Sequence, residues 1–210
     1  MSFDARKAAA ILCAMQSKTV LVVGDIMLDR FVDGDVIRIS PEAPVPVLGQ
    51  TRMQQMPGGA ANVATNLAQL GITVHLIGVC GEDAAGDSLI TEINSHPAIV
   101  FTPIRIANRL TSVKTRYRAA GQQILRVDDE VTSFIDETAQ AKFLDIATPV
   151  IKRADLVIIS DYGKGSLPST LLKLLIKTAR TNNRPVIVDP KLADLSAYSG
   201  VNLLTPNLGE

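Results

Sequence analysis

The chain has 210 residues, of which 47% are hydrophobic and 20% charged, a composition typical of a globular protein with one large domain or two small ones. Its 21 Lys and Arg residues balance 21 Asp and Glu residues, which excludes a protein drawn to nucleic acid or to an anionic membrane by its overall charge. The two cysteines, Cys13 and Cys80, lack the spacing of a metal site, which favours a reduced, cytoplasmic protein.

The first predicted element is a helix over residues 4–16 that packs on the domain. A basic pair followed by an apolar run, residues 6–15, resembles the start of a signal peptide. Asp4 and the strand-like residues 19–24, which follow almost at once, argue against one. The apolar run is also too short to span a bilayer.

Strand-like and helical patterns then alternate along the chain. The apolar, strand-like runs cover residues 19–24, 73–80, 155–160, 185–189 and 201–205. The helical patterns cover residues 59–70, 83–95, 136–152 and 168–181. Strands that are apolar throughout are buried on both faces, so the pattern predicts an α/β fold with an open, mostly parallel sheet flanked by helices. Ligands of such sheets bind beyond the carboxyl ends of the strands.

Two stretches, residues 31–50 and 99–128, lack helical periodicity. The first contains three prolines, and the second has a turn at Gly121-Gln122. Both predict short strands that form a small β layer, a lid over the strand ends. Because so small a sheet buries little by itself, we expect the lid to pair with the same layer of a second subunit in a homodimer.

Two elements at the start of the chain are suited to a sugar. The adjacent glycines Gly58 and Gly59 allow positive φ and a close approach to a ligand, and Asn62 projects from the first turn of the helix that follows. Asp29 comes soon after the first strand, where a carboxylate can accept hydrogen bonds from hydroxyl groups. Each element can also be structural, as a tight strand-to-helix turn or as a cap.

Three cations, Lys114, Arg116 and Arg118, are spaced two residues apart, so in a strand they point to the same side. Three like charges on one face repel one another unless an anion or carboxylates compensate them. One explanation is a solvated outer face of a hairpin. The other is a grip for a phosphate group on the substrate, which Arg126 across the hairpin can join.

Polar residues also follow three later strands. Asp161 stands among glycines at the end of one strand, where it binds a ligand or forms a structural ion pair. Asp189 and Lys191 place a carboxylate and an ammonium group at the end of the next. Asn207 and Glu210, three residues apart, suit a hydrated Mg²⁺ or the capping of a helix.

Taken together and in this order, these motifs resemble the ribokinase-like sugar kinases. The resemblance covers nearly the whole chain and rests on Gly24…Asp29, Gly58-Gly59…Asn62, Gly78…Gly81…Asp83…Gly86 and Asn207…Glu210. Within that family, one subgroup is matched further: the D-glycero-β-D-manno-heptose 7-phosphate kinases of ADP-heptose synthesis for bacterial lipopolysaccharide. Its likeness lies in residues 40–47, 111–117, 123–128 and 161–165.

The resemblance implies ATP-dependent phosphorylation of a phosphosugar at its anomeric hydroxyl, with ATP and Mg²⁺ as cofactors. Asp29 and Asn62 would contact sugar hydroxyls, with Gly58-Gly59 as the hinge of the lid. Lys114 and Arg116 would hold the phosphate that the sugar carries. The other implied site residues are Asp161 on the sugar side and, at ATP and Mg²⁺, Lys191, Asn207, Leu208, Gly209 and Glu210, the last through water.

One segment of the family pattern does not occur in these 210 residues: Gly-Ala-Gly-Asp, whose Asp acts as the base. We therefore expect a single, incomplete sugar-kinase domain over residues 1–210. The C-terminal part of the fold would be missing, with no catalytic residue within the chain and no turnover by the chain alone. The alternatives are a kinase of another sugar or sugar phosphate, and a non-catalytic sugar-binding or dimerisation module.

Overall fold

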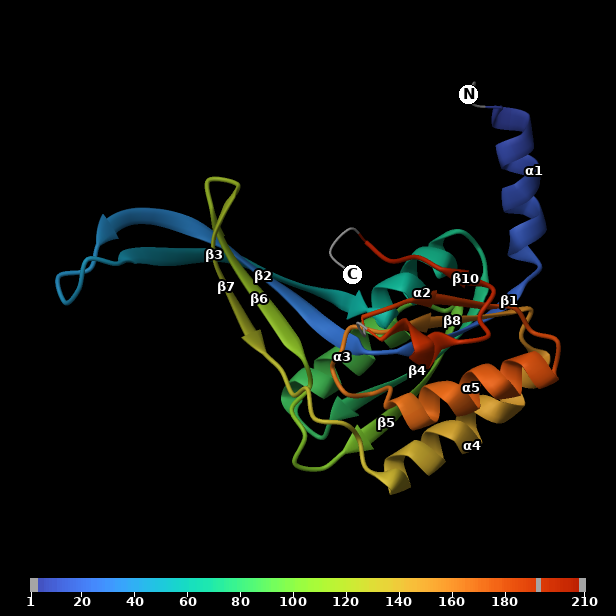
Figure 1. Cartoon of the computed structure of the whole chain (residues 1–210). Coiled ribbons are helices and arrows are strands. Elements are labelled where there is room, and N and C mark those ends of the chain that lie inside the picture. Colours follow the sequence, from blue (N-terminus) through green and yellow to red (C-terminus); the bar gives the residue numbers. More distant parts are fainter. Residues whose placement is uncertain (1–3, 192–193, 208–210) are drawn as a thin grey trace.

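The structure, a computed structural model, describes residues 4–191 and 194–207 (Figure 1). Its centre is a six-stranded sheet in the order β10-β9-β8-β1-β4-β5. The strands are β1 (Thr19–Gly24), β4 (Thr73–Gly81), β5 (Ile99–Ile106), β8 (Leu156–Ser160), β9 (Val186–Asp189) and β10 (Leu203–Leu204). All neighbouring strands of this sheet run parallel, which confirms the predicted α/β fold.

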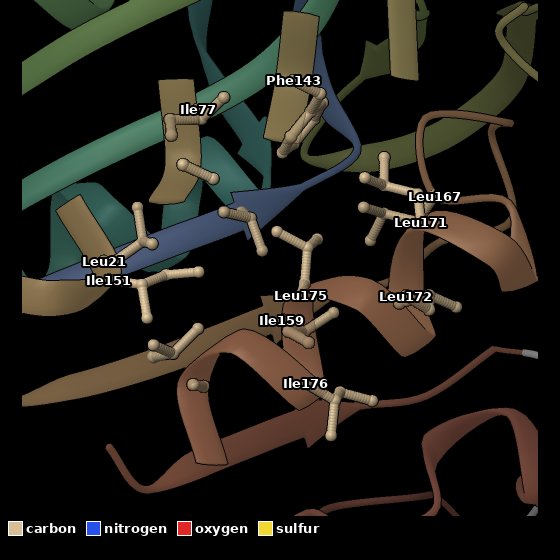
Figure 2. Packing of buried hydrophobic residues seen from close by; sticks show 14 of the residues in the cluster. Leu21, Ile77, Phe143, Ile151, Ile159, Leu167, Leu171, Leu172, Leu175 and Ile176 are labelled. Atoms are coloured by element: carbon tan, nitrogen blue, oxygen red, sulfur yellow. The ribbon is translucent and has the colours of Figure 1, made fainter. Parts of the chain in front are cut away.

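Helices cover both faces of the central sheet because its inner strands are apolar on both sides. The helices are α2 (Ala60–Gln69), α3 (Ala84–Asn94), α4 (Glu137–Arg153) and α5 (Ser169–Thr181). Along β1, Val20 and Val22 point toward α2 and α3, whereas Leu21 and Val23 point toward α4 and α5. The sheet thus has a hydrophobic core on each face. Figure 2 shows the core on the side of α4 and α5, in which Leu21 packs among side chains of these helices. This sandwich holds the strand ends at fixed positions.

A second sheet of four strands extends to one side of this body (Figure 1). Its order is β3-β2-β6-β7, from β2 (Ile26–Ile39), β3 (Pro46–Gly59), β6 (Val113–Ala119) and β7 (Gln122–Asp129). We call it the four-stranded sheet; it corresponds to the predicted β layer. The prediction is wrong for residues 99–106, which form β5 at the edge of the central sheet. Ile99 and Ile104 are buried there beside β4, since a strand pattern does not specify which sheet the strand joins.

The predicted N-terminal helix is present as α1 (Ala5–Gln16), capped by Asp4, whose carboxylate accepts from the N–H of Arg6 and Lys7. Its expected packing on the domain is wrong for most of its length: Met15, near its end, packs against the core, but no residue of α1 is fully buried and the helix stands away from the body (Figure 1). Its large apolar side chains Ile11 and Leu12 are 52% and 41% exposed. Among the described residues, no helix has the length and apolar character needed to cross a membrane.

Candidate functional site

The carboxyl ends of β1 and β8 form the centre of the candidate site. Gly24 ends β1 beside Ser160 of β8, and a Cβ on it would lie 2.0 Å from the carbonyl oxygen of Ser160. The next residue, Asp25, is 1% exposed. Its carboxylate accepts hydrogen bonds from the N–H groups of Tyr162 at 2.8 Å, Lys164 at 3.1 Å and Ser166 at 3.1 Å. Asp25 therefore anchors the loop of residues 161–166, called the 161–166 loop below.

Asp25 is a site residue that the sequence analysis did not select. The available signal was its position directly after a fully apolar strand. Its three partners lie more than 130 residues away, and they converge only because the loop turns at Gly163 and Gly165, which have φ of +65° and +79°. A chain of ordinary residues rarely adopts two such positive φ values in so short a segment.

Asp161, a predicted substrate residue, is buried at the carboxyl end of β8. Its carboxylate accepts from the N–H of Gly163 at 2.8 Å and from the hydroxyl of Tyr198 at 2.6 Å. Tyr198 belongs to the short helix η1 (Leu195–Tyr198). Burial raises the pKa of Asp161, and the neighbouring negative charge of Asp25 adds to the effect. Asp161 thus ties the loop to η1, with both carboxylate oxygens engaged.

The other predicted sugar residues meet where β2 and β3 leave the body. Asp29 lies inside β2 rather than beyond a strand end, because β2 begins only one residue after β1. Its carboxylate forms an ion pair with Arg116 and lies so close to Gly58 that a Cβ there would come within 2.3 Å of Oδ2. Gly59, with φ of +59°, is the N-cap of α2, and Asn62 is exposed on its first turn.

The cations of β6 do share one face, and each has a carboxylate partner. The Lys114 ammonium contacts Asp128 at 2.9 Å and Glu130 at 3.2 Å. Arg118 binds both oxygens of Asp33, at 2.7 and 2.9 Å. The side chain of Lys114 is only 14% exposed, which does not fit a solvated outer face. The protein's own carboxylates therefore compensate the positive charges of these three cations.

The ion pairs continue from the four-stranded sheet to the 161–166 loop. The second oxygen of Glu130 binds the ammonium of Lys164 at 2.7 Å, so Glu130 stands between Lys164 and Lys114. Lys114 holds the pKa of Asp128 below its ordinary value, and Lys164 does the same for Glu130. Both carboxylates therefore stay ionised at neutral pH. The four-stranded sheet and the loop are joined electrostatically at this place.

The predicted ATP and Mg²⁺ residues are described only in part. Lys191 is exposed two residues after the end of β9, and its N–H donates to the Tyr198 hydroxyl at 3.2 Å. Asn207 is exposed shortly after β10. Leu208, Gly209 and Glu210 lie outside the described residues. Within residues 4–191 and 194–207, no group of three or more His, Cys, Asp or Glu side chains is arranged to hold a metal ion.

Comparisons with known proteins identify relatives over nearly the whole chain. Residues 17–210 match the family model described as pfkB family carbohydrate kinase. Bifunctional protein HldE of Hyphomonas neptunium is 43% identical over 202 residues, which are 96% of this chain and 42% of that protein. Bifunctional protein HldE of Caulobacter sp. is 45% identical over 197 residues, or 94% of this chain and 40% of that protein. The chain thus spans less than half the length of these relatives.

Solved structures agree on the fold. A possible 1-phosphofructokinase from Thermotoga maritima has a TM-score of 0.73 at 18% identity and covers 91% of this chain and 61% of its own. Ribokinase of Arabidopsis thaliana, solved with ribose and ATP, has a TM-score of 0.66 at 17% identity and covers 90% of this chain and 60% of its own. These likenesses confirm the predicted ribokinase-like architecture.

Proposed function

The chain belongs to the pfkB family of carbohydrate kinases, and on that premise we propose that it serves the ATP-dependent phosphorylation of D-glycero-β-D-manno-heptose 7-phosphate at the anomeric hydroxyl. Two kinds of similarity support this substrate. The identity to bifunctional HldE proteins is 43–45% over more than nine tenths of the chain. The stretches that resemble heptose 7-phosphate kinases also contain Lys114, Arg116 and residues 161–165 of the 161–166 loop.

One observation carries the proposal. A carboxylate that can accept hydrogen bonds from sugar hydroxyls and two cations that can donate hydrogen bonds to a phosphate lie side by side on the charged face of the four-stranded sheet. Asp29 and Lys114 are register partners on β2 and β6, and Arg116 forms its ion pair with Asp29. An ionised carboxylate accepts hydrogen bonds from sugar hydroxyls, while an ammonium and a guanidinium bind phosphate. A phosphate at this face competes with Asp128 and Glu130 for Lys114.

ATP would lie where β9 and β10 end, near Lys191 and Asn207. An exposed ammonium group and an exposed amide are suitable donors for phosphate oxygens. Mg²⁺ keeps several waters and uses few protein ligands, which suits the proposed contact to Glu210 through water. When bound, ATP supplies the phosphoryl group and Mg²⁺ neutralises the charge that develops on it.

Replacing Lys114 tests this function. Charge-assisted hydrogen bonds contribute roughly 1.5–3 kcal/mol each, so Lys114→Ala in the full-length protein should weaken binding of heptose 7-phosphate at least about tenfold. Isothermal titration calorimetry measures this, and affinity for ATP should stay unchanged. Lys18→Ala is the matched control, because Lys18 also pairs with a carboxylate, that of Asp155, but lies outside the four-stranded sheet, so this variant should bind the sugar like the wild type. Equal losses for both ligands, or no loss for either, would contradict the assignment.

We also propose that two copies associate through the opposite, apolar face of the four-stranded sheet. Tyr117 and Leu125 are register partners that alternate with the cations and therefore point away from them. They line an uncharged hollow of about 360 Å³ together with Val36, Val45, Pro46, Leu48 and Ile124. Exposed apolar patches of this kind mark interaction sites, and a symmetric dimer places the same patch against itself.

Sedimentation velocity distinguishes this dimer from a monomer. The wild-type protein should sediment as a dimer at micromolar concentration, and Leu125→Asp should shift it to the monomer, because a buried carboxylate without a partner is costly. Ile11→Asp on α1 is the control, since Ile11 is equally exposed but lies outside the four-stranded sheet. A wild-type protein that stays monomeric at high concentration would refute the association.

A further inference from the structure

The segment of residues 130–135, which leaves β7 and leads to α4, lies directly against the 161–166 loop; we call it the exit segment. The N–H of Ile135 donates to the carbonyl oxygen of Gly165 at 3.0 Å. Gly165 has φ of +79°, and a Cβ on it would lie 2.1 Å from the carbonyl oxygen of Ser133. With the ion pair between Glu130 and Lys164, these contacts place the four-stranded sheet's exit on the loop that Asp25 anchors.

One side chain holds both segments at once. The guanidinium of Arg109 donates through Nη1 to the carbonyl oxygen of Ser133 at 3.0 Å. Through Nη2 it donates to the carbonyl oxygens of Val131 at 3.3 Å and Lys164 at 2.6 Å. The planar, permanently charged fork of arginine can reach three acceptors in this way, which the single ammonium of lysine does less well. Arg109 thus joins the exit segment to the 161–166 loop.

The backbone of Arg109 is itself fixed to the body. The N–H of Thr111 donates to the Asp83 carboxylate at 2.8 Å, and the Thr111 hydroxyl accepts from the N–H of Gly81 at 2.9 Å. Gly81 is packed so closely that a Cβ on it would lie 2.0 Å from the carbonyl oxygen of Arg109. Asp83 is also the N-cap of α3. The backbone that carries the guanidinium is therefore held between the end of β4 and the start of α3.

We propose that Arg109 is a positioning residue that couples the four-stranded sheet to the 161–166 loop, so that a sugar bound on the sheet's charged face also orders the loop. The coupling rests on the proposed function for the identity of the sugar. The contacts on which the coupling is based do not depend on that function, because Arg109 binds the three carbonyl oxygens in the protein without ligand. When a phosphate draws Lys114 away from Glu130, Arg109 still holds the exit segment to the loop. Ligand binding at the sheet therefore changes how well the 161–166 loop, which contains Lys164, is ordered.

Hydrogen exchange in the full-length protein tests the coupling, with Arg109→Gln as the variant. Without ligand, Arg109→Gln should speed exchange in residues 161–166 about tenfold or more and leave residues 113–129 unchanged. With heptose 7-phosphate, the wild type should gain protection in both regions, and Arg109→Gln only in residues 113–129. The matched control is Arg105→Gln on β5, whose side chain is 37% exposed and whose ion-pair partner Asp87 is 65% exposed. It should behave like the wild type.

Steady-state kinetics provides the second readout. Arg109→Gln should lower kcat for heptose 7-phosphate about tenfold while KM changes less than about threefold, because the sugar contacts on the sheet remain. Arg109→Lys keeps the charge without the fork and should recover only part of kcat; it also serves if Arg109→Gln does not fold. Full activity of both variants, or faster exchange throughout the protein, would overturn the coupling.

The proposed substrate and the coupling can fail separately. If heptose 7-phosphate protects no region of the wild type, the proposed substrate is wrong, and the ligand-free comparison alone then decides the coupling. If the sugar protects residues 113–129 and the 161–166 loop equally in the wild type and in Arg109→Gln, the substrate stands and the coupling through Arg109 is wrong.

Discussion

Asp25→Ala should lower the free energy of unfolding by about 3 kcal/mol or more, because it leaves three backbone N–H groups without an acceptor at a buried position, each worth about 1–3 kcal/mol. Asp25 is 1% exposed, so water does not readily replace the carboxylate. The N–H groups concerned belong to Tyr162, Lys164 and Ser166, which together span the 161–166 loop. Urea unfolding followed by far-UV circular dichroism measures the change.

Asp155→Ala is the matched control for this prediction. Asp155 also accepts a backbone hydrogen bond at an end of β1, from the N–H of Thr19 at 2.9 Å, but its side chain is 41% exposed. Its loss should cost about 1 kcal/mol or less, because water can take over the acceptor's place. If Asp25→Ala is no more destabilising than Asp155→Ala, then Arg109 and the exit segment hold the loop without the carboxylate.

The central sheet could be predicted because its signal is local. A fully apolar run such as residues 20–23 is buried on both faces of the sheet, and helical periodicity marks the segments that cover it. The four-stranded sheet was harder to predict from the sequence. A single residue, Asp25, separates β1 from β2, so one strand-like stretch feeds two sheets. Likewise, the pattern of residues 99–106 is that of a strand in either sheet, and only the pairing with β4 decides.

The candidate site shows the same division between local and distant information. The shared face of Lys114, Arg116 and Arg118 follows from the period of a strand and was predicted correctly. The partners of the two arginines, Asp29 and Asp33, lie more than 80 residues away, and they meet only through the parallel register of β2 with β6. The spacing of residues along the sequence does not predict that register.

Asp29→Ala should weaken binding of heptose 7-phosphate more than about a hundredfold while the protein stays folded. On the proposed function its carboxylate accepts hydrogen bonds from two hydroxyls, at roughly 1.5–3 kcal/mol each, and about 1.4 kcal/mol corresponds to a factor of ten. The stability cost should be small, about 1 kcal/mol or less, because the ion pair with Arg116 is partly exposed. Calorimetric titration and a thermal melt measure the two effects.

Asp33→Ala separates a sugar contact from a structural ion pair. Asp33 lies on the same face of β2 and pairs with Arg118, and both Arg116 and Arg118 lie over the ring of Phe31, at 5.3 and 4.8 Å from its centroid. Each variant removes one partly exposed aspartate–arginine ion pair from the same face, so both should lose little stability. Only Asp29 lies beside Gly58, where β3 returns to the body, so only its loss should weaken sugar binding. Equal effects of both variants on sugar affinity would make Asp29 a support for its arginine rather than a ligand of the sugar.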